Sequence, residues 1–318
     1  MKSVDVAVLG ASGYIGHEAA ETLAGHPFAG NVLTPSTEEL PEFAGSEVIF
    51  TALPHGTSAE YVAKFSGLGS TVIDFTGEFR FQTAEKYESS YGQSHPAPDL
   101  LPVPYGLPEH SREDLRGKSI AAIPGCYPTG ALLALRPLID NDMIEPNHPI
   151  FIDAVSAVSG AGKTPSELTH FMNISGNAIP YKTGDVHRHV GEIEQFLEDR
   201  PVLFSPMIIN LERGMHVASN VILPTGVTAE EAREVLITRY SGEPFVQVLD
   251  EDRLPAVKDT SGTDECHIGV VGVGQAVQLG SSLDNLRKGG SSQGVHAFNI
   301  MMGYPETAGL TSKASMRP

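Results

Sequence analysis

Residues 4–16 of the chain read VDVAVLGASGYIG, and this stretch decides the fold of the N-terminal part. Val4–Leu9 is an apolar, β-rich run, three glycines follow with GxxGxxG spacing, and apolar residues then recur at helical spacing until Gly25. The pattern predicts a strand, a sharp glycine turn and a helix, whose first turn offers unpaired N–H groups and a positive dipole end to a pyrophosphate. We therefore interpret the turn as a dinucleotide-binding loop, the alternative being a tight strand-to-helix turn without a ligand. The candidate cofactor-binding residues of this loop are Gly10, Ser12, Gly13, Tyr14, Ile15 and Gly16.

The residues that follow continue the alternation of strands and helices. Apolar runs at 47–53 and 71–75 predict two further strands, and residues 58–65 between them predict a helix. This rhythm is typical of a parallel sheet, so the fold class is α/β. In Rossmann domains an acid about 20 residues after the loop binds the ribose of NAD, whereas an arginine favours NADP. The expected strand end has neither; Thr34 and Ser36 could bind a 2′-phosphate or cap the next element, so charge leaves the two cofactors open.

Composition and charge exclude several classes of function. The chain has 318 residues, 41% apolar and 19% charged, as in an ordinary globular protein of two domains. Its formal net charge of −18 repels phosphate backbones and anionic membranes, so we expect neither nucleic acid nor a membrane as a partner. Two cysteines without CxxC spacing support neither a disulfide framework nor a zinc site, and no apolar run reaches the roughly 18 residues of a membrane span. We expect a cytoplasmic protein without a metal, in which the proline-dotted residues 94–108 are the segment most like a linker.

Cys126 stands where a strand is predicted to meet a helix. Residues 119–123 are strand-like, the turn Pro124–Gly130 follows, and residues 131–135 are good helix formers. A thiol at a helix N-terminus feels the dipole and nearby N–H groups, which favour the nucleophilic thiolate and can also receive an oxyanion. We interpret Cys126 as a nucleophile, the alternative being a small buried hydrophobe. Cys266 heads an apolar run and is expected to be structural.

The run IPGCYPTG, residues 123–130, resembles the active-site signature of the N-acetyl-γ-glutamyl-phosphate reductase family, relatives of the aspartate-semialdehyde dehydrogenases. Other stretches resemble the family in the same order along nearly the whole chain. They are residues 10–16, Ala52–Gly56, Asp74–Arg80, Tyr105–Glu109, Ser159–Lys163, His187–His189 with Glu192 and Ile193, and Asp284–Gly289. The cysteine signature and the His-Arg-His segment are specific, whereas the glycine loop by itself is not.

The resemblance implies a reductive dephosphorylation. The Cys126 thiolate attacks an acyl phosphate, phosphate leaves, and a nicotinamide hydride reduces the thioester to a thiohemiacetal that collapses to an aldehyde. The resemblance also implies that the His-Arg-His segment supplies the acid–base group. We expect this group to be His189, because the apolar spacing after it predicts a helix and a helix N-terminus keeps an imidazole neutral. His187 is the alternative.

The implied substrate carries a phosphate and a carboxylate, which cations must hold locally in this acidic chain. The candidate substrate-binding residues are Lys163, Tyr181, His187, Arg188 and Arg213, with Arg80 as a weaker one. Each cation has a surface ion pair as its alternative, and Tyr181 could equally be a packing residue.

The chain departs from the family pattern at two places. The stretch after the first helix is short and lacks the Ser-Arg element that would meet a 2′-phosphate, so NADP is inherited from the resemblance and NAD is not excluded. Residues 293–299 replace a Gln- and Asn-rich run, so no nicotinamide contact carries over to His296 or Ala297. Asn285 stays a candidate cofactor-binding residue.

These features predict an N-terminal Rossmann domain with a parallel sheet, plus a mixed α/β catalytic and dimerisation domain. The first comprises residues 1–125 and 288–318, with a helix from about residue 288 returning to it, and the second residues 126–287. We expect a homodimer or homotetramer that acts on a small-molecule acyl phosphate, N-acetyl-γ-glutamyl phosphate, in arginine biosynthesis. The alternatives are the same chemistry on aspartyl phosphate or on a carrier-bound aminoadipyl or glutamyl phosphate, and a non-catalytic nucleotide-binding sensor.

Overall fold

The computed structural model describes residues 2–36, 46–250 and 252–311. Contacts divide the chain into two compact units: unit 1 consists of Met1–Gly125 and Gly289–Thr311, and unit 2 of Cys126–Lys288. Residues 312–318, predicted to belong to the first domain, lie outside the described residues. The assignment of cofactor binding and catalysis to separate domains stays a prediction.

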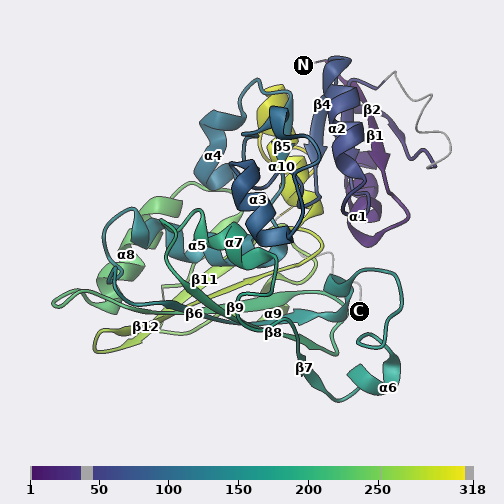
Figure 1. The fold of residues 1–318 in the computed structure, drawn as a ribbon. Coiled ribbons are helices and arrows are strands. Elements are labelled where there is room, and N and C mark those ends of the chain that lie inside the picture. The colour runs from purple at the N-terminus through teal and green to yellow at the C-terminus, as the bar shows by residue number, and fades with distance from the viewer. Residues whose placement is uncertain (1, 37–45, 251, 312–318) are drawn as a thin grey trace. The chain divides into compact units, whose positions relative to one another are not determined.

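Unit 1 is a parallel sheet with helices on both faces, which confirms the predicted Rossmann-like architecture (Figure 1). Its elements are β1 (Val4–Leu9), α1 (Tyr14–Ala24), β2 (Ala29–Leu33), β3 (Val48–Thr51), α2 (Ser58–Gly67), β4 (Thr71–Asp74), α3 (Ala84–Tyr91), η2 (Pro98–Leu100), α4 (Pro108–Leu115), β5 (Ile120–Ala122) and α10 (Ser291–Met302). The strands stand in the order β2-β1-β3-β4-β5, and every adjacent pair is parallel. Alternate residues of a strand point to opposite faces, so Val6 and Val8 pack with α1, α4 and α10, whereas Ala7 and Leu9 pack with α2. Strands that are apolar on both faces favour this buried parallel sheet.

The strand order places the glycine loop at the edge where ligands bind in such sheets. Because all strands are parallel, their carboxyl ends share one edge, and β2 and β3 lie on opposite sides of β1. Open α/β sheets bind ligands outside the carboxyl ends, at the point where the strand order reverses. The turn that follows Leu9 stands at this point.

The interpretation of residues 94–108 as linker-like is wrong. Val103 and Leu107 are buried in unit 1, and Tyr105 forms a parallel bridge to Ala122. The prolines therefore shape a packed segment along the edge strand β5.

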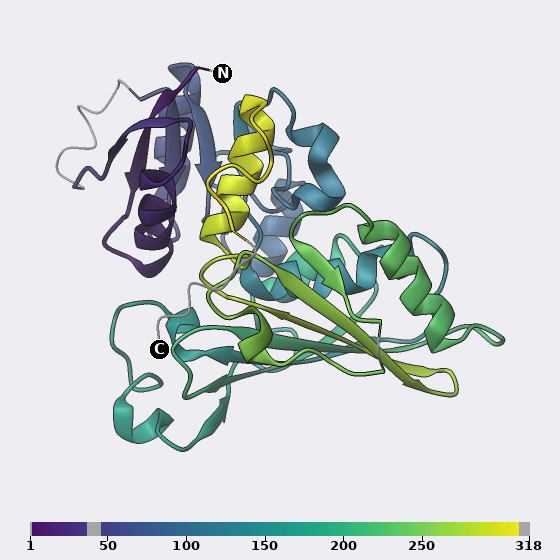
Figure 2. The ribbon, with the colours of Figure 1, turned by 180° about the vertical axis from the view of Figure 1, so that it is seen from behind.

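Unit 2 is a seven-stranded mixed sheet with most of its helices on one face (Figure 2). Its elements are α5 (Cys126–Ile139), β6 (Ile150–Ala157), η3 (Val158–Ala161), α6 (Phe171–Ile174), β7 (Ala178–Pro180), α7 (His189–Glu194), β8 (Val202–Ile209), β9 (Met215–Ile222), α8 (Ala229–Tyr240), β10 (Val246–Val248), α9 (Val257–Thr260), β11 (Cys266–Val273) and β12 (Ala276–Leu283). The strand order is β10-β11-β12-β9-β6-β8-β7. α5, α7 and α8 pack on one face, while α9 covers part of the other, where Thr260 hydrogen-bonds Ser282 over 2.9 Å. Within the described residues, no helix has the length and apolarity to cross a bilayer.

Candidate active site

Cys126 is the first residue of α5, at the predicted junction of strand and helix. β5 ends at Ala122, and residues 123–125 lead directly into the helix. The thiol is half-buried and is not part of a disulfide. The first-turn N–H groups have no acceptor within the helix, and together with the positive dipole end they favour a thiolate. The helix begins earlier than the expected residue 131, and Pro128 is tolerated because an N–H in the first turn needs no helical partner.

Close packing fixes the first turns of α5 on the sheet. Ser281 on β12 donates its hydroxyl to the carbonyl oxygen of Gly130 over 2.9 Å. A Cβ on Gly130 would lie 2.8 Å from the Ser281 Oγ and 3.1 Å from Val217, so a larger residue would push the helix away. The candidate nucleophile is therefore held by a rigid element.

Two tyrosines near the nucleophile form a hydrogen-bonded pair. Tyr181 donates its hydroxyl to that of Tyr127 over 3.0 Å, and Ser156 at the end of β6 also hydrogen-bonds Tyr127. Burial raises the pKa of Tyr181 to about 12; the bond to Tyr127 and the charge of Arg188 oppose the rise, and the charge of Cys126 adds to it. Burial also raises the pKa of Tyr127, and the charge of Cys126 again contributes. Both phenols stay protonated at neutral pH and sense the charge of a Cys126 thiolate.

The two predicted histidines meet in a turn beside these tyrosines. Their ring centroids lie 4.7 Å apart, and the His187 Nδ1 accepts a hydrogen bond from the His189 backbone N–H over 3.2 Å. Both rings pack edge-on against Tyr127, with centroid distances of 5.7 Å for His187 and 5.9 Å for His189. Burial, followed by the charges of Arg188 and Lys182, lowers the pKa of His187 to about 3, so this imidazole is neutral at neutral pH. α7 begins at His189 and packs against α5, the helix of the cysteine.

Two loops of unit 2 are tied together by Asn285. The pairing of β6 with β9 and of β9 with β12 places the loops 158–163 and 210–214 at the same end of the sheet. The Asn285 Nδ2 donates to the Ser159 Oγ over 3.0 Å, and its Oδ1 accepts from the Gly214 backbone N–H over 2.7 Å. The side chain of Asn285 is buried, so it holds the two loops in a fixed relation.

Arg213 lies in one of these loops and pairs with a buried carboxylate. Its Nε is 3.4 Å from the Asp284 Oδ2, and its side chain is 30% exposed. Asp284 is fully buried and accepts hydrogen bonds from the backbone N–H groups of Gly262 and Leu286. Burial raises the pKa of Asp284, and the charge of Arg213 opposes this rise. An ion pair was the alternative for Arg213, but a guanidinium has five donors, so an ion-paired arginine can still bind an anion.

The other candidate cations differ in their surroundings. Lys163 and Arg188 are exposed, the first after η3 and the second between the two histidines. Arg80 belongs to unit 1, is buried, and donates to the carbonyl oxygens of Ile123 and Phe75, each over 2.7 Å. Arg80 therefore braces the backbone just before the cysteine turn.

In unit 1 the glycine loop has the compact geometry that a pyrophosphate requires. Gly10 has φ +81°, and a Cβ there would lie 2.4 Å from the carbonyl oxygen of Ala52. A Cβ on Gly16 would lie 2.3 Å from the carbonyl oxygen of Gly10, which also accepts the Gly13 N–H over 3.0 Å. Gly13 is the N-cap of α1 and makes no side-chain hydrogen bond, so the first turn of the helix presents its backbone N–H groups. Around this turn Ser12 and Tyr14 are exposed and Ile15 is half-buried. These residues fit a dinucleotide pyrophosphate.

Unit 2 brings most of the predicted catalytic and substrate residues close to one another. The residues gathered around Tyr127 are Cys126, Tyr181, His187 and His189. Ser156 and Asp284 were missed from sequence. A single serine in an apolar strand gives no signal, whereas Asp284 could have been found from its place beside Asn285 in a family-like segment.

Comparison with known proteins gives matches along nearly the whole chain. The family model described as the semialdehyde dehydrogenase NAD binding domain matches residues 29–118, and the one described as the dimerisation domain matches residues 126–285. N-acetyl-γ-glutamyl-phosphate reductase of Magnetococcus marinus is 36% identical, with 98% of each chain covered. The protein of that name from Pelotomaculum thermopropionicum is 38% identical, covering 97% of this chain and 98% of its own.

Solved structures show the same fold at lower identity. Aspartate semialdehyde dehydrogenase II of Vibrio cholerae has a TM-score of 0.75 at 20% identity, covering 95% of this chain and 99% of its own. The enzyme of Candida albicans, solved with NADP, has a TM-score of 0.69 at 16% identity, with coverages of 94% and 98%. With the identities of the sequence relatives, these findings show that the chain belongs to the N-acetyl-γ-glutamyl-phosphate reductase family of semialdehyde dehydrogenases.

Proposed function

We propose that this protein catalyses the NAD(P)-dependent reductive dephosphorylation of N-acetyl-γ-glutamyl phosphate to the semialdehyde, a step of arginine biosynthesis. The observation that carries the proposal is the position of Cys126 at the start of a fixed helix, next to Tyr127, whose ring packs edge-on against the imidazoles of His187 and His189. The relatives named for this reaction match the chain over nearly its full length. A cytoplasmic location, where thiols stay reduced, suits an enzyme with a cysteine nucleophile.

The chemistry begins with the sulfur of Cys126. The thiolate attacks the acyl carbon, the bond between this carbon and the phosphate oxygen breaks, and inorganic phosphate leaves with the electron pair. The nicotinamide dinucleotide, when bound, supplies the hydride that reduces the resulting thioester carbon. The first-turn N–H groups of α5 offer donors to the oxygen of the tetrahedral species. When the C–S bond breaks, the aldehyde leaves and the thiolate is restored.

In this proposal His189 exchanges protons with the Cys126 thiol and with the oxygen of the tetrahedral species. His187 orients His189. A group with a pKa of about 3 carries almost no proton at neutral pH, so His187 is a poor general acid. His187 instead accepts the backbone N–H of His189, which fixes the start of α7. Tyr127 packs against both rings and keeps them in an apolar setting.

In this proposal three cations of unit 2 hold the anionic groups of the substrate. Arg213 and Lys163 lie in the loops that Asn285 ties together, and Arg188 lies between the histidines. We assign these three cations to the phosphate and the carboxylate of the substrate, with Tyr181 lining the site. Guanidinium groups bind both anions through paired N–H donors.

The dinucleotide is held by the glycine loop of unit 1. The Gly10–Gly16 backbone and the start of α1 would hold the pyrophosphate. The glycines let the backbone pack tightly in this turn, and no side chain caps the N–H groups at the start of the helix. The family resemblance implies NADP, the dinucleotide present in the solved structure of the Candida albicans neighbour. NAD is the alternative. The pyrophosphate-binding residues do not distinguish the two, so the choice depends on the residues after β2.

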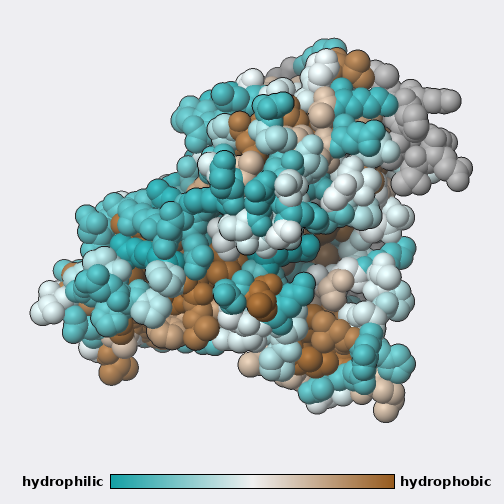
Figure 3. Space-filling view, in the orientation of Figure 1, coloured by the Kyte–Doolittle hydropathy of each residue, from teal (hydrophilic) through white to brown (hydrophobic). Residues whose placement is uncertain are grey.

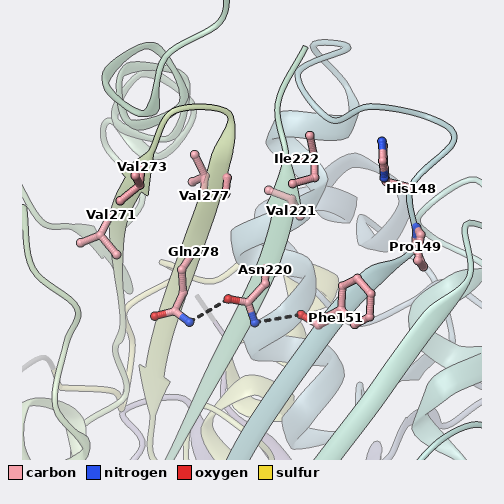
Figure 4. Close-up of a pocket in the computed structure, with 12 residues that line it drawn as sticks. His148, Pro149, Phe151, Asn220, Val221, Ile222, Val271, Val273, Val277 and Gln278 are labelled. Atoms are coloured by element: carbon pink, nitrogen blue, oxygen red, sulfur yellow. Dashed lines mark hydrogen bonds between the residues drawn. The ribbon is translucent and has the colours of Figure 1, made fainter. Parts of the chain in front are cut away.

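A second copy of the chain is proposed to cover the open face of the unit 2 sheet. A hollow of about 390 Å³ lies on this face, lined by residues of neighbouring strands that include Phe151, Ile222 and Val273 (Figure 4). Phe151 is 45% and Val273 86% exposed, although such side chains usually favour burial. Figure 3 shows hydrophobic surface along the same sheet. The matching family model is described as a dimerisation domain over residues 126–285, which supports a homodimer or a tetramer built from it.

Turnover in the reverse direction tests the proposed function. Aldehyde, phosphate and oxidised dinucleotide are supplied, with N-acetylglutamate semialdehyde compared with aspartate semialdehyde. We expect kcat/KM to favour the first by at least about 100-fold, roughly 3 kcal/mol. Equal rates, or faster turnover of aspartate semialdehyde, would show that the substrate assignment is wrong.

Substitution of the cysteine separates an enzyme from a nucleotide-binding sensor. Cys126→Ser should lower kcat by orders of magnitude and leave dinucleotide affinity unchanged, because the glycine loop is untouched. Cys266→Ser is the matched control: Cys266 is buried at the start of β11, so the change tests packing alone and should keep activity. If the protein were a non-catalytic sensor, neither variant would change any measured activity or the dinucleotide affinity.

A further inference from the structure

The first part of unit 1 has an unusual distribution of charge. Between Lys2 and Lys64 the sequence contains no lysine and no arginine. The same stretch contains eight acids: Asp5, Glu18, Glu21, Glu38, Glu39, Glu42, Glu47 and Glu60. This stretch spans β1 to α2, the part of a Rossmann domain that binds the adenosine half of a dinucleotide.

The two lysines at the ends of this stretch lie away from the edge where the dinucleotide binds. Lys2 precedes β1, and its Nζ lies 2.7 Å from the Glu47 Oε1, just before β3. Both positions are at the amino edge of the parallel sheet, opposite the glycine loop. Lys64 lies in the last turn of α2, which starts after the carboxyl end of β3 and runs back along the sheet, with its Nζ 5.5 Å from the centre of the Phe65 ring.

The carboxyl end of β2, where a 2′-phosphate would lie, offers only hydroxyl groups among the described residues. Thr34 and Ser36 follow the strand directly and are exposed. The cation that follows β4 at this edge is Arg80, which is buried and donates to two backbone carbonyl oxygens. In the sheet, β4 is three strand spacings from β2, about 14 Å, so Arg80 is too far to replace a cation at β2.

We propose that this protein binds NAD(H) in preference to NADP(H), with Thr34 and Ser36 as the residues that meet the ribose hydroxyls. The proposal rests on the dinucleotide binding of the proposed function and deepens it. The 2′-phosphate adds a charge between about −1.5 and −2, as phosphomonoesters do near neutral pH. Among the described residues between Lys2 and Lys64 this charge would meet no lysine or arginine, whereas a ribose 2′-OH needs only a hydrogen bond.

Direct binding measurements test this preference without turnover. The wild-type protein is titrated with NADH and with NADPH by calorimetry, from about 0.05 M to about 0.5 M NaCl. We expect NADH to bind about tenfold more tightly at low salt, and the gap to narrow as salt screens the repulsion. Equal or tighter binding of NADPH at low salt would overturn the proposal. If neither nucleotide bound, both this proposal and the dinucleotide role of the glycine loop would fail.

A charge placed at β2 provides the second test. Thr34→Arg should raise the affinity for NADPH about tenfold and change that for NADH less than twofold, because only NADPH has a phosphate for the guanidinium to bind. The matched control is Ala63→Arg, which adds the same charge at an exposed position near the end of α2. An equal gain in both variants would reduce the effect to net charge, and no gain at Thr34→Arg would place the 2′-position elsewhere; either result contradicts the assignment.

Discussion

The side chain of His187 contributes to the pH dependence of the free energy of unfolding. Its imidazole is buried among Tyr127, Tyr181 and Phe204, with ring centroids between 5.1 and 5.7 Å away. A buried imidazole cannot easily take up charge, and the neighbouring Arg188 makes protonation harder still.

The resulting pH dependence has a definite sign. The pKa of His187 is about 3 in the folded chain against an ordinary 6.5, so the unfolded chain binds more protons between these values. The free energy of unfolding must therefore fall as the pH falls from 6.5 toward 3. His187→Phe keeps the aromatic packing and removes the titrating group, so stability should depend less steeply on pH in this window. Urea unfolding at a series of pH values measures the slope, and an unchanged slope would contradict the low pKa.

Residues with a distinctive chemical context could be predicted from the sequence. Cys126 and the two histidines stood in motifs that implied their chemistry, and the structure places all three near Tyr127. Ser156 could not be predicted, because its role depends on a contact with Tyr127 that crosses from β6 to α5.

At the scale of elements, the glycine turn and α1 act as one unit. Gly16 is buried in the first turn, and its missing side chain lets the helix sit on the carbonyl of Gly10. Gly16→Ala would place a methyl group 2.3 Å from that oxygen, so the loop must shift, and we expect at least a tenfold loss of dinucleotide affinity, about 1.4 kcal/mol. Gly67→Ala is the control: Gly67 ends α2, and a Cβ there meets no atom within 4 Å. Calorimetric titration of both variants measures the difference, and equal affinities would show that the close approach is unimportant.

The loops at the end of the unit 2 sheet form the second element-scale device. Asn285 was predicted to bind the cofactor, yet its amide bonds Ser159 and Gly214. Asn285→Asp keeps the acceptor for the Gly214 N–H and replaces the Nδ2 donor with oxygen, so the loop of Lys163 should loosen from that of Arg213. We expect the KM for phosphate in the reverse reaction to rise about tenfold, with dinucleotide affinity changed less than twofold. A large loss of dinucleotide affinity with an unchanged phosphate KM would instead support the cofactor role.

Regular elements could be predicted from periodicity, but short ones could not. The strand, turn and helix of residues 4–24 follow the predicted pattern, and β3, α2 and β4 lie within their predicted ranges except that α2 extends to Gly67. α6 has four residues and β7 has three, which is too short for an apolar repeat. Contacts with the surrounding loops stabilise these two elements instead. Residues 94–108 were misjudged because proline marks a turn without showing whether it is buried.

At the scale of the whole molecule, the open face of unit 2 should set the oligomeric state. Phe151→Asp would put a charge into the proposed contact with a second copy, where it would be desolvated without a partner. We expect the variant to sediment as a smaller species than the wild type at the same concentration. Leu68→Asp is the control, since Leu68 is 59% exposed at the end of α2 in unit 1. An unchanged sedimentation coefficient for Phe151→Asp would show that this face is not the interface.

Local motifs mark the places where the sequence analysis divides the molecule, whereas none marks where its loops converge. The breaks at Gly125 and at Lys288 fall next to the cysteine signature and the Asp284–Gly289 segment, which local motifs mark. The gathering of Lys163, Arg213 and Asn285 depends on the register of β6, β9 and β12, which no local pattern encodes.

Capture of the acyl group on sulfur tests the central claim most directly. The protein is incubated with N-acetylglutamate semialdehyde and oxidised dinucleotide but without phosphate, so that an oxidised acyl group has no acceptor other than water. Peptide mass spectrometry should then find the N-acetylglutamyl group on Cys126, and added phosphate should remove it. An unmodified Cys126, or the group on Cys266 instead, would contradict the account.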